Sequence, residues 1–347
     1  MDFRAPPPSP VASARRSSLP DDDVFRQFLD TSLRLPTIND HRQPPPPKVD
    51  FRYLCSDNAL RHVVSESLAT VGCFQLINHG IPLDLIASTA EDAVGIFQMP
   101  PEKRASAARS PESPCGFEEQ DSEENELSQE FVWGTDIDFN IKMETLFPVG
   151  YSNFSKKMDT LQSRIEKVAE IILTVIIKDS PKKFANCVEM IGGHERGTLC
   201  CVYKHNPANT QSQWTNSLRY DVIRMLVRGN DYSHSLCLHV CHDALDFQLY
   251  SKKGWLSFSP EKRALVITGG DQAQILSDGH YKHVIGRPIF KGEKGDFISM
   301  AFLYSPPNSK NNYETSGERT ISLALQAMLA MILTIVYHVL IYVYKKI

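Results

Sequence analysis

The 347-residue sequence has no CxxC pair among its eight cysteines and no strong excess of charge of either sign. Without paired cysteines, zinc ribbons and disulfide frameworks are not expected, and the cysteines are interpreted as reduced, mostly small apolar residues. A formal net charge of −4 gives no indication of a nucleic-acid surface. The amino end lacks a signal-peptide pattern, which favours an intracellular protein.

One long segment, residues 321–344, has no formal charge at all. As a helix it would rise about 36 Å, which exceeds a bilayer core of about 30 Å. Three tyrosines lie toward one end, and Lys345 and Lys346 follow, as is typical of a membrane interface. We predict a single membrane span here, with a buried core helix as the alternative. The rest of the chain is then expected in the cytosol, tail-anchored to the endoplasmic reticulum rather than to the mitochondrial outer membrane.

The remaining sequence divides by composition. Residues 1–20 are rich in Pro, Ser and Ala and are predicted to be disordered, with a transit peptide as the alternative. Residues 21–180 are predicted to be mainly helical, and residues 181–307 consist of short β runs separated by Gly, Pro, Asn and Asp. Helices followed by many short strands predict a helical layer that supports a β-sandwich or jelly roll. Residues 308–320 are interpreted as a linker.

Two segments of the helical region have clear boundaries. In "SDNALRHVVSESLATVG", Ser56 or Asp57 can cap the helix, an apolar stripe follows at helical spacing, and Gly72 ends it. A second helix is predicted within "LDLIASTAEDAVGIFQMPPEKR", ending before Pro100. A strand and turn, "CFQLINHGIP", are expected to join the two helices.

Three motifs carry a resemblance to a known family. "GCFQLINHGIP" (Gly72 to Pro82) resembles the N-terminal signature of plant 2-oxoglutarate and iron(II)-dependent dioxygenases. That group includes gibberellin oxidases, flavonoid synthases and 1-aminocyclopropane-1-carboxylate oxidase. "FQMPPEKR" (Phe97 to Arg104) is similar to the end of the family's next helix, and the run from Trp255 to Arg287 keeps the family's order and spacing.

The resemblance implies a mainly β fold with N-terminal helices and a double-stranded β-helix (jelly-roll) core, here followed by one C-terminal transmembrane helix. In the family, a His-x-Asp pair on one strand and a distant His on another bind iron(II). Three positions stay open for 2-oxoglutarate and oxygen. An Arg-x-Ser pair on a late strand then binds the far carboxylate of 2-oxoglutarate.

This sequence has other residues at the family's ligand positions. No His-x-Asp or His-x-Glu occurs in the chain, and Asp231 and Ser233 stand where the pair is expected. Gly286 stands at the distal histidine, and a glycine has no side chain to bind a metal. Phe297 replaces the arginine of Arg-x-Ser, whereas Ser299 is retained. Ser299 is therefore the one cofactor-binding residue that the resemblance predicts.

Other histidines are candidates for substitute ligands. His234, His239 and His242 crowd one segment, but strand residues three apart point to opposite faces. His283 lies three residues before Gly286, so the same parity turns it away from the side of the lost ligand. We interpret these histidines as partly exposed strand residues, and we predict no metal site and no catalytic residue.

The family's "NYYP", which lies near the cosubstrate, is replaced by "YKHN" (Tyr203 to Asn206). These losses indicate a dioxygenase-like pseudoenzyme, tethered to a membrane, that uses neither iron(II) nor 2-oxoglutarate. It would bind a protein, or a small molecule in the former substrate pocket. Two alternatives stay open: an active 2-oxoglutarate and iron(II)-dependent oxidoreductase with an atypical metal site, and a small-molecule sensor.

Overall fold

The computed structural model describes residues 44–110, 113–118, 128–179, 198–205, 232–251, 254–290 and 297–306. The chain divides into two compact units, Met1–Pro307 and Asn308–Ile347, and every described residue belongs to the first. The predicted disordered segment, linker and membrane span lie outside the described residues. Within the described ranges, no helix is both long enough and apolar enough to cross a membrane.

The first half of the unit is mainly helical. Its helices are α2 (Asn58–Thr70), α3 (Leu83–Phe97), α4 (Pro101–Ser106), α5 (Ile137–Leu146) and α6 (Pro148–Asp179), with a 3-10 turn at Phe51–Tyr53. Its strands are β1 (Lys48–Asp50), β2 (Cys73–Ile77), β3 (Gly116–Phe117) and β4 (Ser128–Trp133). Asp57 caps α2 by accepting a 2.8 Å hydrogen bond from Ala59 N. Gly72 follows α2 at φ +80, which L side chains rarely adopt.

The second half supplies most of the strands of two sheets. They are β5 (Leu199–His205), β6 (Leu236–Val240), β7 (Asp246–Ser251), β8 (Gly254–Phe258), β9 (Leu265–Gly269), β10 (Ile285–Ile289) and β11 (Phe297–Tyr304), with α9 (Asp271–Leu276) between β9 and β10. The large sheet has the order β1-β2-β9-β6-β11-β5-β4-β3, and the small sheet has the order β10-β7-β8. All pairings are antiparallel except β1 with β2. This mainly β core agrees with the predicted jelly roll.

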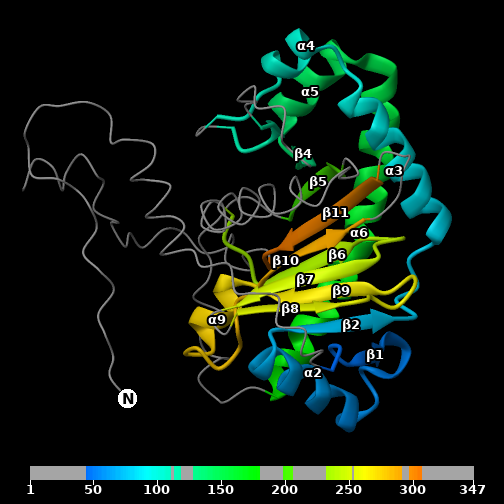
Figure 1. Ribbon diagram of the computed structural model, residues 1–347. Coiled ribbons are helices and arrows are strands. Elements are labelled where there is room, and N and C mark those ends of the chain that lie inside the picture. The colour runs from blue at the N-terminus through cyan, green and yellow to red at the C-terminus, as the bar shows by residue number, and fades with distance from the viewer. Residues whose placement is uncertain are drawn as a thin grey trace, which may run out of the picture. The chain divides into compact units, whose positions relative to one another are not determined.

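The large sheet is covered on both faces. On its outer face, α3 and α6 pack against the central strands, and α6 crosses behind them in Figure 1. Leu236, Leu238 and Val240 of β6 point into this helical core. On the inner face, residues of β2 and β9 pack against buried residues of the small sheet, including Phe247 and Leu249. The inner face is where the family's chemistry would lie.

Candidate functional site

Gly286, which the resemblance places at the distal histidine, lies against a neighbouring aromatic side chain. Gly286 of β10 pairs with Leu249 of β7, so the alternating Phe247 and Leu249 side chains lie on the side toward which residue 286 would point. A Cβ at Gly286 would lie 2.7 Å from Cζ of Phe247 and 3.2 Å from Cδ2 of Leu249. Phe247 is fully buried and packs edge-on against His239, with ring centroids 5.0 Å apart. A side chain at position 286 would therefore displace the core.

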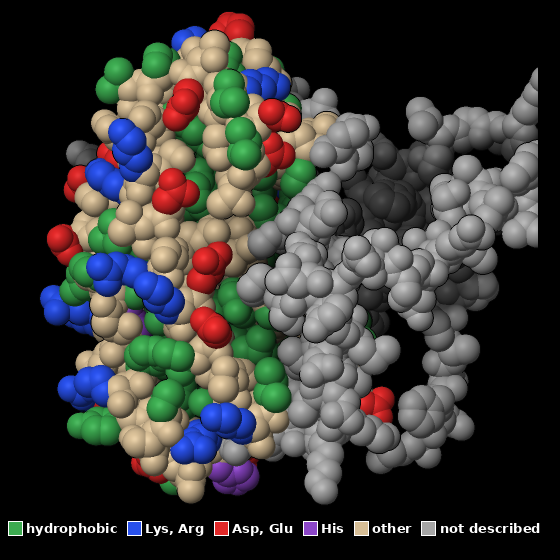
Figure 2. Space-filling model, turned by 180° about the vertical axis from the view of Figure 1, so that it is seen from behind, with side chains coloured by type: hydrophobic (Ala, Val, Ile, Leu, Met, Phe, Trp, Pro, Cys, Tyr) green, Lys and Arg blue, Asp and Glu red, His purple; other side chains and the backbone are tan. Residues whose placement is uncertain are grey.

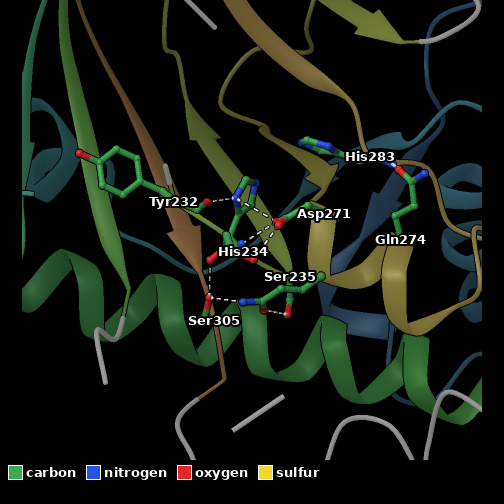
Figure 3. A network of polar contacts seen from close by, with 9 residues as sticks. Tyr232, His234, Ser235, Asp271, Gln274, His283 and Ser305 are labelled. Carbon is green, nitrogen blue, oxygen red and sulfur yellow. Dashed lines mark hydrogen bonds and ion pairs between the residues drawn. The ribbon is translucent and has the colours of Figure 1, made fainter. Parts of the chain in front are cut away.

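The position of the family's aspartate is held by a hydrogen bond to the next helix. Ser233 Oγ donates to Asp271 Oδ2 at 2.6 Å, and the backbone N–H of His234 donates to Asp271 Oδ1 at 2.8 Å (Figure 3). Asp271 is the first residue of α9 and comes from the motif shared with the family. Through its hydrogen bond to Asp271, the Ser233 hydroxyl thus helps to hold the backbone just before β6.

The same helix ties in the end of β11. Ser235 Oγ donates to Gln272 Oε1 at 2.7 Å, and Gln272 Nε2 donates to Ser305 Oγ at 3.3 Å. Ser305 Oγ in turn donates to the carbonyl oxygen of Ser233 at 3.1 Å, which closes a ring of contacts (Figure 3). We call these residues, with Asp271, the α9 network. Its hydrogen bonds hold the backbone of residues 233–235 in place before β6.

The position of the cosubstrate clamp is occupied by stacked rings. Phe297 stacks on Phe290 with ring centroids 5.0 Å apart and planes 10° apart, and Phe290 contacts the ring of His205 at 4.9 Å. Ser299 is buried, and its Oγ lies 2.7 Å from Nε2 of His205. Burial, together with the charge of Arg287, lowers the pKa of His205 to about 3, so the imidazole is neutral. A carboxylate here would meet phenyl rings in place of a guanidinium.

The prediction of partly exposed strand histidines is wrong for His234 and His239, which are buried. His239 lies on β6 with Nε2 3.3 Å from Thr268 Oγ1, and burial lowers its pKa to about 3. His242 and His283 are half-buried, as expected.

The parity argument fails for His242, which lies in the turn after β6, and it fails as well for His234 and His283, because neither of these two lies on a strand. They precede β6 and β10 respectively, and their rings approach edge-to-face with centroids 6.0 Å apart (Figure 3). Burial lowers the pKa of both imidazoles. The two rings are therefore neighbours that the sequence did not predict.

The described residues do not fit the metal and cosubstrate of the family. No group of three or more His, Cys, Asp or Glu side chains in the described part of the chain is placed to hold a metal ion. Position 286 offers no ligand atom and no room for one, and Phe297 offers no donor to a carboxylate. The predicted role of Ser299 in binding a cofactor stays a prediction.

A buried ion pair beside the inner face had no clear signal in the sequence. Arg109 Nη1 donates to Glu130 Oε1 and to the hydroxyl of Tyr232, both at 3.1 Å. The Tyr232 hydroxyl donates to the carbonyl oxygen of Pro114 at 3.0 Å. Arg109 and Glu130 both belong to the helical half, and Tyr232 lies in the segment before β6. The bond from Arg109 to Tyr232 therefore joins the helical half of the unit to the jelly roll. Burial raises the pKa of Tyr232 to about 12.

Comparison with known sequences points to one class of protein. The family described as "non-haem dioxygenase in morphine synthesis N-terminal" matches residues 47–152. Jasmonate-induced oxygenase 1 of Arabidopsis thaliana is 24% identical over 314 residues, which cover 85% of this chain and 73% of that protein. The flavonol synthase/flavanone 3-hydroxylase of the same plant is 23% identical over 308 residues, covering 86% and 88%.

Solved structures show the same fold. JOX2 in complex with 2OG, Fe and JA superimposes with a TM-score of 0.55 at 19% identity, covering 85% of this chain and 87% of that one. A 2OG-Fe(II) oxygenase family protein of Caulobacter crescentus gives a TM-score of 0.56 at 14% identity, covering 76% and 87%. In sequence the chain is therefore similar to plant non-haem dioxygenases and oxygenases, and its fold is the jelly roll of the solved 2OG-Fe(II) oxygenases.

Proposed function

We propose that this chain is a dioxygenase-like pseudoenzyme that acts by binding. The observation that carries the proposal is the buried ring of Phe247 in the space that a side chain at Gly286 would need. An iron-binding histidine cannot be replaced by a glycine with closely packed surroundings unless another side chain binds the iron instead. Within the described residues, no set of side chains does so.

The stacked rings at the clamp support the same conclusion. Binding a dicarboxylate next to Phe297 would place a charged group against apolar rings, at a cost of several kcal/mol when the charge is unpaired. The relatives are named as oxygenases, which favours the alternative of an active oxidoreductase with another metal site. The pseudoenzyme and the active oxidoreductase differ in whether the chain binds iron.

Metal analysis of the full-length chain separates them. The chain is reconstituted anaerobically with iron(II), freed of excess metal, and assayed for iron and for conversion of 2-oxoglutarate to succinate. A flavonol synthase treated in parallel is the control. We expect iron far below one atom per chain and no succinate above background, whereas stoichiometric iron with succinate formation would establish the active enzyme.

We further propose that residues 321–344 tether the protein to a membrane, with the jelly roll in the cytosol. The support is the uncharged length of the segment with its tyrosines and the flanking Lys345 and Lys346. A fluorescent fusion at the amino end should sediment with membranes and be lost to protease added outside sealed microsomes. Deletion of residues 321–347 should release it, and a full-length protein that stays in the supernatant would contradict the tether.

A further inference from the structure

Helix α5 presents an unusual apolar surface. Ile137 is 73% exposed and Ile141 is 57% exposed, and Val149, in the first turn of α6, is 76% exposed. Ile137 and Ile141 are four residues apart, so they lie on the same side of α5. The opposite side of this helix is buried through Phe139 and Met143. We call Ile137 and Ile141 the α5 face.

This clustering needs an explanation beyond packing. Single exposed aliphatic side chains are ordinary on a protein surface, but groups of them mark sites of interaction. Half of the large hydrophobic residues that are exposed in the described ranges lie within this short stretch. A helix whose buried side already packs on the core gains nothing for folding from isoleucines on its other side.

The charges around the α5 face favour one sign of partner. Asp138 and Glu144 lie three residues before and after Ile141, and therefore border it on the helix surface. Helix α5 and its N-cap residue carry three exposed carboxylates, Asp136, Asp138 and Glu144, and one exposed lysine, Lys142. Figure 2 shows apolar, acidic and basic side chains interspersed at the end of the molecule that carries α4 and α5.

We propose that the α5 face is a docking site for a basic amphipathic helix of a protein partner. An apolar stripe with acidic borders complements a helix with an apolar stripe and basic borders. A second copy of this chain would bring the same carboxylates together, and an anionic lipid surface would be repelled by them. The inference rests on the proposed function, because it names a protein as what the pseudoenzyme binds.

Because the inner face is occupied by side chains of the protein itself, the outer surface is the better place for a partner to bind. Phe247 fills the space at Gly286, and Phe290 and Phe297 stack on each other at the clamp. These side chains come from the chain itself and are engaged with one another. The α5 face, in contrast, offers large aliphatic groups that contact solvent.

The test uses the full-length chain and a synthetic probe. The probe is a fluorescent Leu/Lys amphipathic peptide of roughly 18 residues, about five helical turns, and a peptide with Glu in place of Lys is its control. Binding is followed by anisotropy for the wild type, for Ile137→Ser/Ile141→Ser, and for Ile275→Ser, a matched aliphatic site 73% exposed elsewhere. We expect the double variant to weaken Leu/Lys binding by at least about tenfold, with no change for Ile275→Ser and weaker binding at high salt.

Several results would overturn the docking site. They are no binding of the Leu/Lys peptide, equal binding by the double variant, or equal binding of the Glu peptide. Sedimentation showing a dimer that the double variant abolishes would make a second copy the occupant instead, and flotation with anionic vesicles that depends on Ile141 would make it a membrane. Thermal unfolding of each variant checks that the fold is intact. Because iron uptake is measured separately, a chain that binds both iron and the peptide would refute the proposed function alone.

Discussion

Gly286 and Phe247 share one space across the pair of strands β7 and β10. A Cβ on the glycine would come within 2.7 Å of Cζ of the buried ring, well inside contact distance. In the resembling family this position carries an iron-binding histidine. If Gly286 stands at that position, as the resemblance implies, its close packing against Phe247 leaves no space for a histidine, and stability measurements can test this.

Restoring the histidine at this position should destabilise the protein. We expect Gly286→His to lower the free energy of unfolding by about 1–3 kcal/mol, because the buried ring must move. Urea denaturation measures the change. Gly279→Ala is the control, since it also alters a glycine but has no atom within 4 Å of the added Cβ, leaving only the strain of φ +76.

A second substitution, at Phe247, tests whether the two residues compete for the same space. Phe247→Ala alone should be costly, because a fully buried ring is removed. If the two residues compete for one space, Gly286→His should cost less in a Phe247→Ala background than in the wild type. Simple additivity of the two changes would show that they do not share it.

Arg109 should contribute to stability through its ion pair with Glu130 and through its bond to Tyr232, which links the helical half to the jelly roll. Arg109→Met removes the 3.1 Å bonds to Glu130 and Tyr232, and breaking one partner of a buried pair costs about 3–5 kcal/mol. Denaturant unfolding of Arg109→Met and of Arg109→Met/Glu130→Gln measures this. The double variant should be more stable than the single one, and a single variant as stable as the wild type would contradict the assignment.

Stability should fall as the pH is lowered below neutrality. Burial lowers the pKa values of His205 and His239 to about 3 in the native protein, whereas the pKa of a histidine in the unfolded chain is about 6.5. Between these values the unfolded chain binds more protons than the native one, so acid favours unfolding. Each histidine should remove about 2 kcal/mol between pH 7 and pH 5.

The pH effect is checked with a single substitution. His239→Gln keeps a polar side chain near Thr268 but does not titrate, so its stability should depend less steeply on pH than that of the wild type. His280→Gln, at an exposed histidine for which we predict no role, serves as control. Identical slopes for the wild type and His239→Gln would show that His239 titrates normally in the native state.

The sequence predicts the elements whose signals are local. The Asp57 cap, the end of α2 before Gly72 and the short β runs all follow from propensity and turn chemistry, and the family motifs identify the jelly roll. Leu236, Leu238 and Val240 alternate along β6 and lie in the helical core, so this local pattern marks one of the buried faces of the strand.

From the sequence, the site could be predicted only as a set of positions at which the family's residues are replaced by others. What fills it depends on contacts between distant residues: Phe247 with Gly286 through the register of β7 and β10, and Phe297 with Phe290. The burial of His234 follows from α9, whose Asp271 is 37 positions away. Strand parity could not anticipate this, because His234 precedes the strand.

The most direct test of the central claim is an anaerobic calorimetric titration of the full-length chain with iron(II), followed by 2-oxoglutarate. A chain whose distal ligand position is Gly286, packed against Phe247, should show no saturable heat for either at micromolar concentrations. An iron-binding relative titrated under the same conditions should show both. Saturable binding of iron(II) and then of 2-oxoglutarate, each near one per chain, would contradict the account.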